Sequence, residues 1–279
     1  MRNGVLGDWR TIVSIRVNVI GLALAASAVA MPVRAQSLAQ RVGAVGTGTA
    51  VLRYTARPGT CGDGRDSFSF GSGMHFGTWY GRSSDGMMSP ACEPGPARVW
   101  LRVERGTITS MRVSVGPART SEAPPTELGA VPSTEAAAFF LALADSAEDN
   151  VGRQAIVAAV LADSVTVWPK LLTIAGDSVR ASRRLRHDAT FWLGQFAAAK
   201  VAGNGENLGA TDDGGDRDDA RSAAVFALSQ LRGHAGVEPL LQVARTNRDP
   251  VVRRKALFWL GESGDPRAIA LFREILRGG

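Results

Sequence analysis

The stretch FWLG occupies residues 191–194, and the same four letters return at 258–261. This separation is about twice the period of helical repeats, which is roughly 33 to 47 residues. A third copy is therefore expected between them, and AVFALSQ at 224–230 places Phe226 at the position aligned with Phe191 and Phe258. The repeated stretch predicts an array of similar helical units.

The last copy gives the clearest picture of one unit, DPVVRRKALFWLGESGDPRAIALFREIL at 249–276. Asp249 can cap a helix that begins at Pro250, where proline is tolerated because the first amide needs no helical partner. Gly264, Asp265 and Pro266 then interrupt the pattern, as glycine and proline do at helix ends. A second amphipathic helix follows, with apolar residues spaced by three and four. The unit is expected to be a helical hairpin.

In the pattern DPVVRRKAL…LG…GDPRAI, this hairpin resembles a HEAT-type repeat of the short bacterial kind. The resemblance covers about 150–279 and is strongest in 218–279. It implies an α-solenoid over 134–279 whose surface binds a protein partner. A glycine-rich acidic loop at 201–219 stands where one unit should have its second helix.

The N-terminal segment 1–35 has the features of a secretory signal peptide. Arginines precede an apolar run over about 17–30, and Val33-Arg34-Ala35 forms a small-x-small cleavage box. The mature chain is expected to begin near Gln36, to be periplasmic or secreted, and to contain no membrane span. Retention of the segment as an anchor stays open, although the run is shorter than the about 20 residues that a spanning helix needs.

Residues 36–116 are expected to form a small β-rich domain. ARVWLRVERGTITSMRVSVG at 97–116 contains two alternating runs on either side of Arg105-Gly106, which predicts a β-hairpin. A Pro-rich linker, 117–133, is expected to separate this domain from the helices. The predicted fold class is therefore α+β multidomain, with a small disulfide-bonded β domain followed by a HEAT-like α-solenoid.

The disulfide is expected between Cys61 and Cys92, because both lie in turn-rich sequence and an exported chain meets an oxidising compartment. A metal site with His75 as a third ligand is the alternative. It is disfavoured because the chain has no closely spaced cysteine pair.

Charge and motif content exclude several other functions. The formal net charge is +6, and removal of 1–35 takes away four arginines and one aspartate, leaving about +3. Because no clustered basic patch with aromatic residues is evident, no nucleic-acid partner is expected. The aspartates of the 201–219 loop lack the spacing of a calcium-binding EF-hand loop. No cofactor is expected, and the scattered histidines without a catalytic motif predict a protein that is not an enzyme.

The repeated aromatic residues suggest where a partner would bind. Helical geometry places Trp259 and the aligned Trp192 on the buried stripe of their helices. Phe191, Phe226 and Phe258 face away from that stripe, so they are candidates for a partner-binding row. The predicted function is an exported, non-catalytic interaction scaffold. The alternative is an envelope ligand-binding module, in which the β domain binds a small molecule or glycan in a pocket lined by His75, Trp79, Tyr80 and Trp100.

Overall fold

The alternating segment at 97–116 folds as the expected hairpin, with β6 (Ala97–Glu104) and β7 (Thr107–Val115) joined at Arg105 and Gly106. Both joining residues have positive φ. The hairpin belongs to a four-stranded sheet in the order β7-β6-β1-β8, where β1 is Gly48–Tyr54 and β8 is Thr126–Ala130. Val99, Leu101 and Val103 are fully buried on one face of β6, as the alternation predicts.

The computed structural model describes residues 36–65, 67–70, 74–76, 92–118, 125–147, 149–203, 208 and 220–278. The expected signal peptide, 1–35, and most of the acidic 201–219 loop therefore lie outside the described residues. Gln36–Gly279 forms one compact unit. Within the described ranges, no helix combines the length and the apolar character needed to cross a membrane.

A second, smaller sheet contains the two cysteines. Its strand order is β4-β3-β2-β5, and the strands are β2 (Thr60–Gly62), β3 (Phe68–Phe70), β4 (Met74–Phe76) and β5 (Glu93–Pro94). Cys61 in β2 is bonded to Cys92, which directly precedes β5, so the expected disulfide is confirmed. The alternative metal site would need free thiolates on the same two cysteines, and the disulfide removes them.

The disulfide gives a direct chemical test. The oxidised protein is expected to take up no alkylating reagent under denaturing conditions, and to take up two equivalents after reduction. Intact-mass measurement of both samples reads the result. Two labelled cysteines in the unreduced protein would contradict the bond between Cys61 and Cys92.

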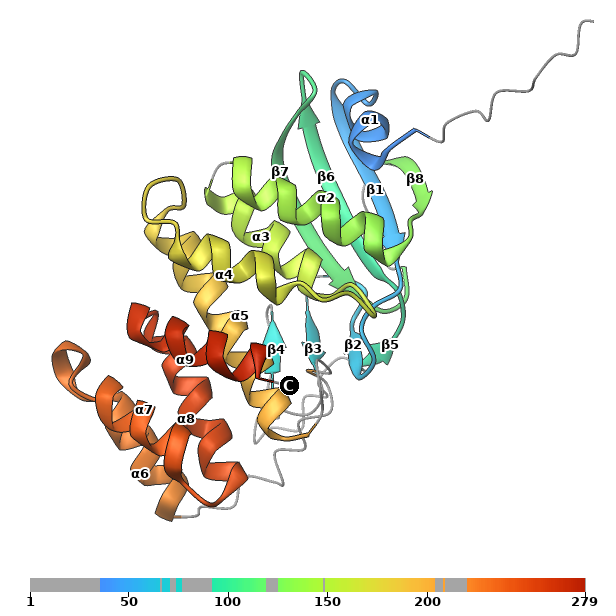
Figure 1. Cartoon of the computed structure of the whole chain (residues 1–279). Coiled ribbons are helices and arrows are strands. Elements are labelled where there is room, and N and C mark those ends of the chain that lie inside the picture. The colour runs from blue at the N-terminus through green and yellow to red at the C-terminus, as the bar shows by residue number, and fades with distance from the viewer. Residues whose placement is uncertain are drawn as a thin grey trace, which may run out of the picture. The chain divides into compact units, whose positions relative to one another are not determined.

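The helices α8 and α9 begin and end where the sequence predicts, but they do not form a closely packed hairpin, because α9 packs mainly on α5 and α4 and α8 packs on α5, α6 and α7 (Figure 1). The Asp249 side chain caps α8 by accepting from the amide of Val251 at 2.9 Å, and Asp265 caps α9 by accepting from Arg267 at 2.9 Å. Gly264 ends α8 with φ 61°, a left-handed conformation that glycine adopts without strain. The described helices are α1 (Leu38–Gly43), α2 (Ser133–Ser146), α3 (Asp149–Val160), α4 (Trp168–Gly176), α5 (Arg183–Val201), α6 (Ala220–Ser229), α7 (Val237–Thr246), α8 (Pro250–Ser263) and α9 (Pro266–Arg277).

The two FWLG copies lie on α5 and α8, and these helices pack directly against each other. A Cβ added to Gly194 would lie 2.9 Å from the Gly261 Cα and 2.9 Å from the Leu257 carbonyl oxygen. A Cβ added to Gly261 would in turn lie 3.1 Å from the Phe191 carbonyl oxygen. The two glycines therefore let the backbones of α5 and α8 approach closely. This contact gives a physical reason for the repetition of FWLG.

The packing order of the helices differs from the order implied by the resemblance. A solenoid stacked along the chain would place α6 between α5 and α8. Instead α8 packs directly on α5 and also contacts α6 and α7. The middle copy has Ser229 where the other two have Gly194 and Gly261, so it lacks the residue that permits the close approach. A helical C-terminal region is present, but a regular solenoid in chain order is not.

The expected linker 117–133 also needs correction, because β8 lies within it. This strand pairs in parallel with β1, and the amide of Val131 donates to the carbonyl of Arg53 at 2.8 Å. Residues at the end of the predicted linker thus form an edge of the larger sheet. The segment is rich in proline, which favours a linker, but proline beside an edge strand does not prevent that strand from pairing.

The strands and the helices share one hydrophobic core rather than forming two separate domains. Tyr54 of β1 donates its hydroxyl to the Ala158 carbonyl of α3 at 2.6 Å, and burial raises the pKa of this phenol far above its ordinary value. Arg57 is buried and donates from Nε to the Val160 carbonyl at 3.0 Å. The ring of Phe140 on α2 lies 6.1 Å from the ring of Tyr54. Figure 1 shows α2 and α3 beside the larger sheet.

Candidate partner-binding groove

Aromatic side chains form a connected series from the smaller sheet to α6. Successive ring centroids lie 5.0 to 6.4 Å apart, the range in which edge-to-face pairs are favourable. The series runs Phe68, Phe70, Trp192, Phe191, Phe258, Trp259 and Phe226. Its first members are buried and its last member reaches the surface, so only one end of it is open to a partner.

The expected row of Phe191, Phe226 and Phe258 is not uniformly exposed. Phe226 is 48% exposed, whereas Phe191 and Phe258 are partly buried, and their rings contact each other at 6.4 Å. The physical reason is the packing of α8 directly on α5, which turns the two phenylalanines of the FWLG copies toward one another. Of the three candidate phenylalanines, Phe226 is the one whose side chain is exposed to solvent.

The two tryptophans of the repeated stretch also differ. Trp192 is 1% exposed and contacts Phe70 at 5.5 Å, so its predicted place in the core is confirmed. Trp259 is only partly buried and packs against the edge of the core, so its predicted place on the buried stripe is confirmed only in part. Its ring packs against Phe226 at 5.2 Å and also lines a groove.

This groove lies between α8 and the connection from α6 to α7, and its volume is about 420 Å³. Trp259, Val237 and Leu240 supply much of its apolar lining, and Leu231 is a 47% exposed apolar residue in the same lining. The sequence did not single out Leu231, because a leucine between Gln230 and Arg232, just after the end of a helix, carries no pattern of its own. We call these residues together with Phe226 the α6–α8 groove.

Polar groups hold the connection beside this groove in place. Gly233 and His234 both have positive φ, which turns the chain sharply between α6 and α7. His234 Nδ1 lies 3.6 Å from Oδ2 of Asp265. Hydrogen bonds from the side chain and amide of Arg267 lower the pKa of Asp265, against a smaller opposing effect of burial, so this cap stays ionised. The groove wall is therefore anchored to the start of α9.

The structure describes only part of the pocket in which the β region was expected, as the alternative function, to bind a small molecule or glycan. Trp79 and Tyr80 lie outside the described residues, as does the side chain of His75. Trp100 is 5% exposed, and the guanidinium of Arg112 lies 4.3 Å above its ring. Trp100 is thus covered rather than open to a ligand. No group of three or more potential metal-binding side chains occurs among the residues the structure describes.

Comparison with known proteins identifies the C-terminal segment alone. No curated protein and no solved structure gives a significant match to the chain. The family model described as HEAT repeats matches residues 213–279, which include α6 to α9 and the whole α6–α8 groove. The segment 213–279 is therefore a HEAT-type repeat segment.

Proposed function

We propose that the protein is an exported, non-catalytic scaffold that binds a protein partner through the α6–α8 groove. HEAT repeats suggest protein interaction, and the groove lies in the segment that matches them. The observation that carries the proposal is Phe226, which is 48% exposed and packs on Trp259 at the open end of the aromatic series. Aromatic side chains, phenylalanine included, are enriched at the centres of protein–protein interfaces.

Export is the second component of the proposal, and it is supported by the composition of 1–35 and by the disulfide. A bond between Cys61 and Cys92 is typical of compartments that oxidise thiols. The non-catalytic component rests on the sequence, in which no catalytic motif brings a nucleophile beside a base. A partner segment with an apolar side chain facing Trp259 fits this chemistry.

Replacing Phe226 and Leu231 with Glu is expected to abolish partner capture. Loss of a binding anchor costs about 2 kcal/mol or more, which corresponds to about thirtyfold in affinity. Both side chains are about half exposed, so each substitution should cost the fold about 1 kcal/mol and leave it intact. The measurement is a pull-down from a periplasmic extract with the chain from Gln36, quantified by mass spectrometry.

Val179→Glu provides the matched control, because Val179 is 91% exposed and lies in the connection between α4 and α5. This variant should capture the same proteins as the wild type. If the Phe226→Glu/Leu231→Glu variant retained every protein that the control retains, the groove would not be the binding surface. Detection of the chain only in the cytoplasmic fraction would contradict export.

A further inference from the structure

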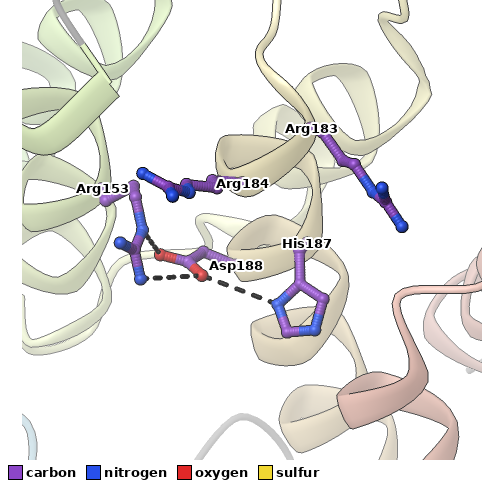
Figure 2. Close-up of a pocket in the computed structure, with 5 residues that line it drawn as sticks. All are labelled: Arg153, Arg183, Arg184, His187 and Asp188. Atoms are coloured by element: carbon purple, nitrogen blue, oxygen red, sulfur yellow. Dashed lines mark hydrogen bonds and ion pairs between the residues drawn. The ribbon is translucent and has the colours of Figure 1, made fainter.

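A second cavity, of about 380 Å³, is lined by charged side chains of α3 and α5 (Figure 2). Its lining consists of Arg153, Arg183, Arg184, His187 and Asp188. Nothing in the α6–α8 groove contributes to it. Four of the five lining residues are arginine or histidine, and only one, Asp188, is a carboxylate. The lining therefore has an excess of groups that carry positive charge.

The single carboxylate is already paired. Arg153 donates from Nε to Oδ2 of Asp188 at 2.5 Å and from a terminal nitrogen to Oδ1 at 3.4 Å. Burial opposes ionisation of Asp188, but its hydrogen bonds with His187 and Arg153 outweigh that effect and lower its pKa. The Arg153–Asp188 pair is therefore neutral overall and forms one wall of the cavity.

Arg183 and Arg184 have no such partner. Neither makes a hydrogen bond or an ion pair with any residue in the described part of the chain. Figure 2 shows Arg184 pointing toward Arg153 and Arg183 pointing the other way, on the side of His187. Both arginines are exposed, so their guanidinium groups can turn toward a ligand above the neutral pair.

His187 adds a third cationic group to the cavity. Its Nδ1 lies 3.7 Å from Oδ1 of Asp188, and this interaction, with the carbonyl of Glu262 at 3.0 Å from Nε2, raises the pKa of the imidazole against the effect of partial burial. The imidazolium form is thus stabilised relative to the neutral ring. Glu262 offers its backbone carbonyl to this ring.

The position of the two arginines is not explained by helix stability. They are the first two residues of α5, after the Ser182 cap, and the N-terminus of a helix already carries a partial positive charge. Carboxylates stabilise this position, whereas arginines oppose the helix dipole. Asp149 supplies one carboxylate at this end of α5, where it accepts a hydrogen bond from the hydroxyl of Ser182. In the described part of the chain it makes no ion pair with Arg183 or Arg184, so a negatively charged ligand would compensate the two arginines.

We propose that the cavity of Arg153, Arg183, Arg184 and His187 binds the phosphate group of a phosphate monoester. The two unpaired arginines match the two negative charges of such a group, whereas a single carboxylate would leave one cation uncompensated. Planar guanidinium groups also fit two oxygens of a phosphate at once. The phosphate could be carried by a small molecule or by a lipid headgroup.

The test is isothermal titration calorimetry, in which glycerol phosphate is added to the purified full chain at pH 7.5 and low salt. Saturable binding with a dissociation constant of about 1 mM or tighter is expected. Arg183→Gln/Arg184→Gln should weaken it at least tenfold. Arg245→Gln/Arg277→Gln removes the same formal charge from exposed positions of α7 and α9 and should leave the affinity unchanged.

Vesicles that contain phosphatidic acid distinguish the two sources of phosphate. Vesicle binding that needs Arg183 and Arg184, without binding of glycerol phosphate, would assign the site to a lipid headgroup. The proposal is overturned if neither probe binds saturably, if acetate competes as well as phosphate, or if both double variants lose binding equally. Circular dichroism should show the wild-type helix content in both variants, because the substituted side chains are exposed.

Discussion

Trp192→Ala is expected to lower the free energy of unfolding by about 3 to 5 kcal/mol, the usual cost of truncating a buried aromatic residue. Trp192 is 1% exposed and joins the β region to the helices, because its ring contacts Phe70 at 5.5 Å and Phe191 at 5.2 Å. The cavity left by its removal would border both parts of the shared core. Urea denaturation followed by circular dichroism measures the change.

Trp259→Ala is the matched control for this prediction, since Trp259 occupies the aligned position of the second FWLG copy. It is only partly buried, so its truncation should cost about 1 to 2 kcal/mol. An equal loss for the two variants would show that the repeated stretch has the same environment in both copies. A change below 1 kcal/mol for Trp192→Ala would contradict its place in the core.

Local features of the fold were predictable from the sequence because neighbouring residues determine them. Asp249 and Asp265 cap their helices through backbone amides two residues away, and Gly264 supplies the left-handed end between those helices. Arg105 and Gly106 mark the turn of the β6–β7 hairpin. Each of these signals acts within a few residues of chain, so one sequence is enough to find it.

Long-range packing was not predictable in the same way. Periodicity shows which face of α8 is apolar, but it does not say whether α5 or α6 covers that face. The structure decides this through Gly194 and Gly261, whose missing side chains bring α5 and α8 together although α6 and α7 lie between them in the chain. β8 was missed for a related reason, since its pairing with β1 depends on residues far away in sequence.

The candidate site was also predictable only in part, because the repeat alignment selects residues but does not show which of them the packing of the helices covers. The alignment of the repeats identified Phe226, which is exposed beside the α6–α8 groove. It also selected Phe191 and Phe258, which cover each other because their helices pack together. The arginines at the start of α5 were visible in the sequence, but only the structure shows that Arg153 already neutralises the nearest carboxylate.

Gly194→Leu is expected to destabilise the protein by about 3 kcal/mol, at the upper end of the usual cost of overpacking a core. The added Cβ would lie 2.9 Å from the Gly261 Cα and from the Leu257 carbonyl oxygen, and both are backbone atoms that cannot rotate away. The two helices must separate instead, and the loss of their contact exceeds the gain of up to about 1 kcal/mol from leucine's better helix propensity. Thermal and urea unfolding measure the result.

Gly176→Leu is the control, because a Cβ at Gly176 on α4 meets nothing within 4 Å, and this variant should be neutral or slightly more stable. Combining Gly194→Leu with Gly261→Leu tests the contact between the two copies directly. Once one leucine has moved α5 away from α8, the second meets less resistance, so the double variant should lose less than the sum of the single losses. Additive losses would mean that the two glycines act in separate environments, and that the repetition of FWLG has a cause other than the meeting of its copies.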